Sequence, residues 1–160
     1  MSGDRDSPHG HRAHARPEER RFGAAVLTVS TAGAAGERDD ATGPTIVEAL
    51  GRMGFRVEDA ELTPDDRERI VARLRAWVDD PTVDVVVTTG GTGLTPSDVT
   101  PEATADVIDR PIPGITEAIR LRGLDATPLA ALSRGIAGLA GRTLIVNLPA
   151  KFPDSHYLHD

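Results

Sequence analysis

Residues 83–93 read Val-Asp-Val-Val-Val-Thr-Thr-Gly-Gly-Thr-Gly, a run of β-branched residues that leads directly into a glycine-rich loop. A continuous run of this kind is typical of a central strand in a parallel sheet, buried on both faces. Ligands of open α/β sheets bind beyond the carboxyl ends of the strands, where this loop would lie. The stretch therefore predicts both an α/β fold and the position of its ligand site.

The segments around this strand alternate between strand-like and helix-like patterns. Strands are predicted at 24–29, 55–62, 134–139 and 143–147, and helices at 44–53, 64–78, 102–109 and 114–122. Residues 30–41 read as a loop, and residues 128–133 fit neither pattern. We expect the last two strands to close around a turn at Gly141. The alternation predicts a three-layer α/β sandwich, with a mostly parallel sheet and helices on both faces.

The N-terminal segment differs from the rest of the chain. Residues 1–21 show no apolar periodicity and are filled with glycine, proline, histidine and charged residues. Such a segment does not bury enough apolar surface to offset the entropy of ordering it, so we expect a disordered tail. Residues 22–160 are expected to form a single domain.

The composition excludes several kinds of chemistry. Cysteine is absent, which removes disulfides, thiolate metal sites and cysteine nucleophiles. All five histidines lie close to the chain ends, so the body offers none for a catalytic triad or a zinc site. The net charge of −7 argues against a nucleic-acid partner. No apolar run fits a membrane span or a signal peptide, and we expect a cytoplasmic protein.

The glycine-rich loop is the first candidate site. Gly90, Gly91, Thr92 and Gly93 can form a nest of backbone N–H groups that binds a phosphate, with threonine hydroxyls as further donors. Asp98 follows on the same loop and can hold Mg²⁺ or orient a nucleophile, since oxygen atoms are the ligands that Mg²⁺ prefers. The alternative is a tight turn in which Asp98 is solvated or caps the next helix. The pattern matches neither a P-loop nor a Rossmann fingerprint.

Asp65 is the second candidate, within Thr-Pro-Asp-Asp-Arg-Glu at 63–68. In one interpretation Thr63 caps the following helix, Pro64 takes its first turn, and the acids favour the positive end of the helix dipole. In the other, this loop also lies beyond the carboxyl end of a parallel strand, and Asp65 faces the same site as Asp98. Two carboxylates beside a phosphate nest would suit metal-dependent nucleotidyl transfer.

Three features are less specific. Ser30 ends the first strand and can bind a ligand, or can be an ordinary strand-end hydroxyl. The stretch Asp-Ala-Thr-Gly at 40–43 suggests turn and cap chemistry. Arg134 follows Ser133, and an arginine close to a phosphate site favours bidentate contact with the phosphate.

An ordered series of motifs resembles the MogA/MoaB family of molybdenum cofactor biosynthesis proteins. It comprises ERDDATGP, LTPDDRE, TTGGTG with the aspartate and VTPEAT after it, PIPGITEAIRLRGL, PLAALSRGIAGLAGRTLIV and NLP. The resemblance implies a three-layer α/β fold that assembles as a homo-oligomer, a trimer or a dimer of trimers. In the catalytic members it also implies Mg²⁺ and ATP-dependent adenylylation of molybdopterin, with release of pyrophosphate.

Functional residues follow from the resemblance by position. Asp65 and Asp98 match the two carboxylates tied to activity and are the expected catalytic and Mg²⁺-binding residues. Gly90 to Gly93 match the loop that meets the phosphate, and Ser133 matches a pterin-side position. Ser30 and Pro149 complete the expected substrate-binding residues.

One departure from the family pattern concerns the end of the chain. The family usually continues Asn-Leu-Pro with glycine and a closing helix, whereas here Pro149 is followed by Ala-Lys-Phe-Pro and the chain stops at Asp160. This keeps open a second function, a non-catalytic molybdopterin- or phosphate-binding module of the MoaB type. A third possibility is a structural or regulatory protein that uses the N-terminal tail as its contact segment.

Overall fold

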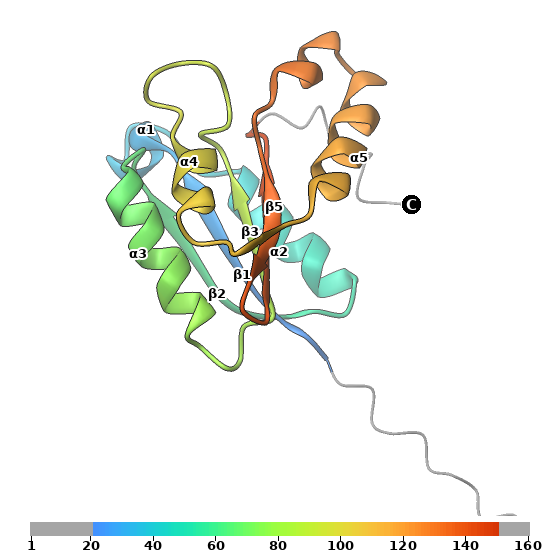
Figure 1. Cartoon of the computed structure of the whole chain (residues 1–160). Helices are drawn as coiled ribbons and strands as arrows, with labels where there is room; N and C mark the ends of the chain where they lie inside the picture. Colours follow the sequence, from blue (N-terminus) through green and yellow to red (C-terminus); the bar gives the residue numbers. More distant parts are fainter. Residues whose placement is uncertain (1–20, 151–160) are drawn as a thin grey trace, which may run out of the picture.

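The computed structural model describes residues 21–150, which form one six-stranded sheet in the order β2-β1-β3-β6-β5-β4 (Figure 1). The strands are β1 (Gly23–Val29), β2 (Arg56–Thr63), β3 (Val85–Thr89), β4 (Arg110–Pro111), β5 (Ala137–Ala140) and β6 (Thr143–Leu148). The helices are α1 (Thr31–Ala34), α2 (Thr42–Arg52), α3 (Arg67–Val78), α4 (Thr100–Ala105), α5 (Pro113–Leu124) and the 3₁₀ helix η1 (Pro128–Leu132). The predicted α/β sandwich is thereby confirmed.

The four strands β2, β1, β3 and β6 are parallel, so their carboxyl ends lie at one edge of the sheet. Val26 of β1 pairs with Val87 of β3, which in turn pairs with Val146 of β6. The chain runs outward from β1 to β2 and then returns across β1 to β3. The topological switch point, where α/β sheets bind their ligands, therefore lies between the ends of β1 and β3.

Each face of the sheet has its own apolar core. On one face Ile70, Leu74 and Trp77 of α3 and Ala103 of α4 pack against the buried side chains of β1, β3 and β6. On the other face, α2 packs with Ile46 and Leu50 against the alternate residues of β1 and β3. The two-sided burial explains why both strands read as continuous apolar runs.

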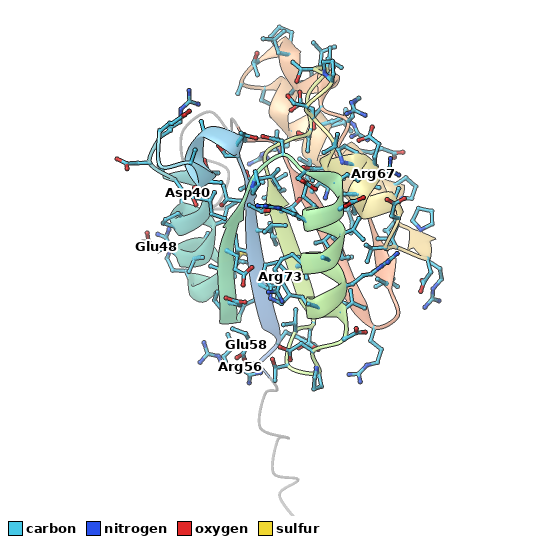
Figure 2. The ribbon with its side chains drawn as sticks, turned by 90° about the vertical axis from the view of Figure 1, so that its left-hand side faces the viewer. Asp40, Glu48, Arg56, Glu58, Arg67 and Arg73 are labelled. Carbon is cyan, nitrogen blue, oxygen red and sulfur yellow. The ribbon has the colours of Figure 1, made fainter. Side chains whose placement is uncertain are left out.

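Ion pairs join α3 to its neighbours through Arg67 and Arg73, two residues of this helix that Figure 2 labels. Arg67 binds both carboxylate oxygens of Asp106 at 2.8 Å, which ties the start of α3 to the end of α4. Further along the same helix, Arg73 contacts Glu61 of β2 at 3.0 Å. These contacts join α3 to α4 and to β2.

The structure differs from the predicted elements in several places. Residues 31–34, expected as loop, form the short helix α1, because the Ser30 hydroxyl accepts a hydrogen bond from Gly33 and caps it. The helix expected from Glu102 to Asp109 is the shorter α4. It is followed by β4, a two-residue strand that contains Pro111 and was not predicted. The ambiguous segment at 128–133 is η1, and the strand expected at 134–139 begins only at Ala137.

The start of α3 was also predicted wrongly. Asp66 caps this helix, with its carboxylate accepting from the Arg69 amide at 3.1 Å, whereas Thr63 ends β2 and is buried. The helix therefore begins at Arg67 instead of Pro64. The Pro64 carbonyl accepts a hydrogen bond from the Asp66 amide, so this residue belongs to a tight turn before the cap.

The terminal segments at 1–20 and 151–160 lie outside the described residues, and so do the predicted tail and most of the divergent C-terminus. Within residues 21–150, no helix is long and apolar enough to span a membrane.

Candidate functional site

The glycine loop leaves β3 at the sheet edge through two residues in the left-handed region, with φ of 92° at Gly90 and 67° at Gly91. A Cβ at Gly90 would lie 2.2 Å from the Val29 carbonyl oxygen, so the loop passes directly over the end of β1. A Cβ at Gly91 would lie 2.3 Å from the Thr100 hydroxyl. Glycine is required at both positions by conformation and by space.

The loop directs its carbonyl groups inward and leaves its amides available. The Gly90 carbonyl accepts from the Thr100 hydroxyl at 2.9 Å, and the Gly91 carbonyl accepts from the Thr100 amide at 3.1 Å. Among residues 21–150, the amides of Gly91, Thr92 and Gly93 have no acceptor. Successive free N–H groups on such a turn form the kind of concavity that binds anions.

Asp65 lies directly after β2 and is held by the neighbouring strand end. Its Oδ2 accepts two hydrogen bonds from Thr31, one from the amide at 3.0 Å and one from the hydroxyl at 2.8 Å. The Thr31 hydroxyl in turn accepts from the Asp65 amide at 3.0 Å. The second oxygen, Oδ1, faces Gly91, where a Cβ would come within 3.2 Å of it. One oxygen thus anchors the side chain, and the other accepts no hydrogen bond from residues 21–150.

Asp98 has a similar arrangement within its own loop. Its Oδ2 accepts from the Thr95 amide at 2.9 Å and from the Thr95 hydroxyl at 2.7 Å. A Cβ at Gly93 would lie 2.8 Å from this oxygen, so the carboxylate rests against the glycine loop. Both sequence-predicted aspartates therefore lie against the loop, Asp65 beside Gly91 and Asp98 beside Gly93. Oδ2 of Asp98 thus closes a turn with Thr95, as one interpretation expected, but Asp98 does not cap α4, whose N-cap is Val99.

The donor set at this edge fits Mg²⁺ of the kind that is shared with substrate phosphates. Asp65 and Asp98 each leave one carboxylate oxygen without a hydrogen-bond donor in the described part of the chain. Over the same residues, no group of three or more acidic, histidine or cysteine side chains is assembled to hold a metal alone. Mg²⁺ commonly takes one or two carboxylates and completes its shell with water and phosphate oxygens.

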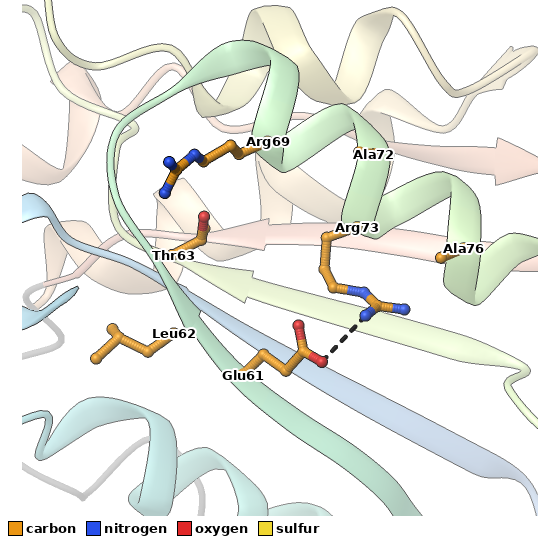
Figure 3. Close-up of a pocket in the computed structure, with 7 residues that line it drawn as sticks. All are labelled: Glu61, Leu62, Thr63, Arg69, Ala72, Arg73 and Ala76. Atoms are coloured by element: carbon orange, nitrogen blue, oxygen red, sulfur yellow. Dashed lines mark hydrogen bonds and ion pairs between the residues drawn. The ribbon is translucent and has the colours of Figure 1, made fainter.

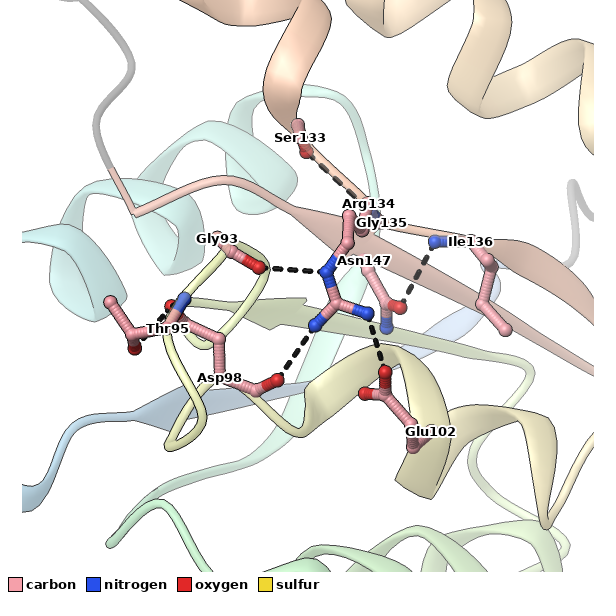
Figure 4. Close-up of polar contacts among 9 residues, drawn as sticks. All are labelled: Gly93, Thr95, Asp98, Glu102, Ser133, Arg134, Gly135, Ile136 and Asn147. Carbon is pink, nitrogen blue, oxygen red and sulfur yellow. Dashed lines mark hydrogen bonds and ion pairs between the residues drawn. The ribbon is translucent and has the colours of Figure 1, made fainter.

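Arg134, in the segment between η1 and β5, holds the glycine loop in place (Figure 4). Its amide donates to the Thr92 carbonyl at 2.9 Å, Nε donates to the Gly93 carbonyl at 2.8 Å, and Nη2 donates to the Asp98 carbonyl at 2.7 Å. The remaining nitrogen, Nη1, binds the Glu102 carboxylate. The sequence suggested that Arg134 contacts a phosphate, but its guanidinium fork is already engaged with the protein, so it organises the loop instead.

The contact between Arg134 and Glu102 shifts the pKa of both groups. The hydrogen bond from Arg134 holds the pKa of the Glu102 carboxyl below its ordinary value, against the opposing effect of desolvation. The same bond raises the pKa of the Arg134 guanidinium. Glu102 is therefore ionised over the physiological pH range, and the clamp is a permanent ion pair.

The less specific residues have defined structural contacts. The Ser30 oxygen accepts from Gly33 at 3.0 Å, and Asp40 accepts from the Gly43 amide at 2.9 Å, which confirms the expected turn and cap chemistry at 40–43. The Ser133 hydroxyl lies 3.4 Å from the Gly135 amide, just before β5. The Pro149 carbonyl accepts from the Thr89 hydroxyl at 3.3 Å. Ser30 and Pro149 follow β1 and β6, and so share the sheet edge with the glycine loop.

Two residues that are important to the site were not predicted to have a role in it. Thr31, which holds Asp65, lay in a segment predicted as loop. Asn147 is 1% exposed, and its amide donates to the hydroxyls of Thr88 and Thr104, both at 2.9 Å. Its Oδ1 accepts from the Ile136 amide at 3.1 Å. Asn147 thereby joins β3, β6, α4 and the start of β5 beneath the loop.

This fold, with its candidate site at the carboxyl edge of the sheet, can be compared with known proteins. A family model described as "Probable molybdopterin binding domain" matches residues 25–153. The chain belongs to this family. As a molybdopterin-binding-domain protein of molybdenum cofactor biosynthesis, it shares the expected three-layer fold with its relatives.

Three individual relatives illustrate the range of this molybdopterin-binding-domain family. The chain is 39% identical over 125 residues to the molybdenum cofactor synthesis protein cinnamon of Drosophila melanogaster, matching 78% of this chain but only 21% of that protein. It is 38% identical over 128 residues to the molybdopterin adenylyltransferase of Helicobacter pylori strain J99, matching 79% and 73%. The crystal structure of the molybdopterin biosynthesis enzyme MoaB from Thermus thermophilus superposes with a TM-score of 0.76 at 51% identity, covering 81% and 82%.

Proposed function

We propose that this protein is a molybdopterin adenylyltransferase that uses ATP and Mg²⁺. One arrangement supports the proposal: the glycine loop offers free amides, and two anchored aspartates flank it with one free oxygen each. A relative named molybdopterin adenylyltransferase, 38% identical over 128 residues, adds to it. An ATP-dependent activity also suits the cytoplasmic location that the sequence predicts.

The proposed reaction needs no histidine base. The amides of Gly91, Thr92 and Gly93 bind the phosphate of molybdopterin and hold it at the carboxyl edge of β3. An oxygen of that phosphate attacks the α-phosphorus of ATP. The new O–P bond forms as the bond to the β-phosphate breaks, and pyrophosphate leaves. A phosphate is already an anion at neutral pH, so positioning and charge neutralisation carry the catalysis.

In this proposal the side chains at the site have different roles. The free oxygens of Asp65 and Asp98 would hold Mg²⁺, which when bound neutralises charge on the reacting phosphates. Thr31 and Thr95 fix the orientation of the two carboxylates through their other oxygens. Ser30, Ser133 and Pro149 are proposed to contact substrate, with Ser133 and Pro149 on the pterin side.

The first experiment measures pyrophosphate release from Mg-ATP with and without molybdopterin. Wild type is expected to release pyrophosphate only when molybdopterin is present, and Asp98→Asn is expected to reduce the rate by about 10²-fold or more. Asp79→Asn is the matched control, because Asp79 is an exposed aspartate at the far end of α3. Unchanged turnover in Asp98→Asn would refute the mechanism.

The second candidate function is a molybdopterin-binding module without turnover. The residues that replace the family's usual glycine after Pro149 favour this alternative. Tight molybdopterin binding by calorimetry, with no pyrophosphate released by wild type, would select it over the transferase.

We also propose that the protein is a homo-oligomer, a trimer or a dimer of trimers, assembled through α5 and η1. These elements pack on one another and expose Leu121, Leu124, Leu129 and Leu132 to 68%, 43%, 67% and 48%. Large exposed apolar side chains that cluster on a monomer commonly mark an interface. Light scattering should give a single multimeric mass for wild type and a smaller mass for Leu121→Gln/Leu129→Gln.

A further inference from the structure

A groove of about 310 Å³ lies between the edge strand β2 and the first turns of α3 (Figure 3). Thr63 and Glu61 line it from the strand, and Arg69 and Arg73 line it from the helix, while alanines on α3 leave the space open. The groove begins at the carboxyl end of β2, two residues before Asp65. It is separate from the glycine loop but opens at the same end of the sheet.

Side-chain contacts between β2 and α3 follow a regular series. Asp59 accepts from the Trp77 indole N–H at 3.1 Å, and Glu61 accepts from Arg73 at 3.0 Å. Each step forward by two residues on the strand is matched by a step back of four on the helix. The distances agree, since two strand residues span ~6.6 Å and four helical residues span ~6.0 Å.

The next step in this series brings Thr63 opposite Arg69. Here the strand supplies a hydroxyl where the previous two positions supply carboxylates. Within residues 21–150 the Arg69 guanidinium makes no hydrogen bond or ion pair, and the Thr63 hydroxyl has no partner either, although Thr63 is only 8% exposed. Figure 3 shows the hydroxyl on the side of the strand that faces Arg69. The groove thus holds an exposed cation, Arg69, and the hydroxyl of a largely buried threonine, and neither is paired among the described residues.

A further hydrogen-bond donor in the groove also lacks an acceptor. The Nε of Arg73 is buried and has no acceptor among the described residues, even though its Nη1 is paired with Glu61. With two arginines and one glutamate, the lining carries a net positive charge in a chain whose formal net charge is −7. An uncompensated cation beside an unpaired hydroxyl is what an anion with several oxygens would satisfy.

We infer that this groove binds the terminal phosphates of a nucleoside triphosphate, with Arg69 and Thr63 as the contacting residues. The inference rests on the proposed function, which puts the phosphates of ATP beside Asp65. The groove is lined along β2 from Thr63, two residues before Asp65, so the phosphates beyond the reacting one would enter it. The same groove would hold pyrophosphate until it is released.

Calorimetric titration with pyrophosphate, ATP and AMP in the presence of Mg²⁺ tests the inference on the full chain. Arg69→Gln is expected to weaken pyrophosphate and ATP binding about tenfold and to leave AMP binding unchanged, because AMP lacks the terminal phosphates. Thr63→Val, which keeps the branched shape, should weaken the same two ligands by a smaller factor. Arg75→Gln is the matched control on the same helix and should bind all three ligands like wild type.

Three results would overturn the inference: wild type that does not bind pyrophosphate, Arg69→Gln that binds it like wild type, or equal weakening in Arg75→Gln. Inorganic phosphate separates the two sources of a phosphoryl group. If it binds through Arg69 as tightly as pyrophosphate does, the assignment to a nucleotide's phosphate chain is wrong. Arg69-dependent ATP binding without molybdopterin-dependent pyrophosphate release would refute the transferase proposal and leave the groove assignment standing.

Discussion

The guanidinium of Arg134 donates a 2.7 Å hydrogen bond to the backbone carbonyl of Asp98, 36 residues earlier in the chain. The segment before β5 thereby fixes the backbone of the loop that follows β3. Asp98 has its side chain held locally by Thr95 and its main chain held by Arg134. Its position therefore depends on one local contact and on one from a distant segment of the chain.

Replacing Arg134 with lysine tests this dependence. Lysine keeps the charge but lacks the planar fork that reaches the carbonyls of Gly93 and Asp98 together. The side chain is 36% exposed, so solvent screens the contact and we expect only a modest loss in the free energy of unfolding. Urea denaturation measures this loss, and pyrophosphate release is expected to fall with it. Arg142→Lys, at an exposed turn, should change neither quantity.

The Arg134–Glu102 pair also predicts a dependence of stability on pH. Because the folded-state pKa of Glu102 lies below its ordinary value of 4.5, the pair stabilises the fold above that pH. This stabilisation is lost as the pH falls through the lower, folded-state pKa. Urea midpoints of wild type and Glu102→Gln should therefore differ at pH 7 and converge on acidification. A difference that stayed constant down to pH 3 would show that the carboxylate charge does not contribute.

Much of the architecture was predictable because it rests on periodic burial. The strand at 83–88 reads as apolar on both faces since α2 and α3 cover both faces of β3. The position of the glycine loop and of Asp65 at one sheet edge followed from the parallel order alone. Elements too short to show a period, such as α1 and β4, left no such pattern.

The contacts that orient the site were not predictable for a different reason. Arg134 binds backbone carbonyls, which every residue carries, so no residue type elsewhere in the sequence marks its partners. Thr31 and Asp65 lie 34 positions apart and meet only because β1 and β2 are neighbours. A strand-end threonine is common, and its role becomes visible only when the register is known.

Gly91 provides a test of the loop conformation. Alanine there would require a φ of 67° and a Cβ 2.3 Å from the Thr100 hydroxyl. We expect a loss of about 2–4 kcal/mol in the free energy of unfolding, together with loss of phosphate-ligand binding. Gly51→Ala is the opposite case, since Gly51 lies within α2 with nothing near its Cβ position. That variant should be about 0.5–1 kcal/mol more stable than wild type in the same denaturation experiment.

The contact between Thr31 and Asp65 gives the last prediction. Thr31→Val removes the hydroxyl that donates to Oδ2 at 2.8 Å and accepts from the Asp65 amide, while it keeps the branched shape. Asp65 then retains only the Thr31 amide as a donor, and its free oxygen loses its fixed direction toward Gly91. We expect pyrophosphate release to fall about tenfold, with an increase in the Mg²⁺ concentration needed for half-maximal rate. Thr31→Ser restores the hydroxyl and should restore both quantities, whereas a serine variant as impaired as valine would mean that packing, and not the hydrogen bond, sets the effect.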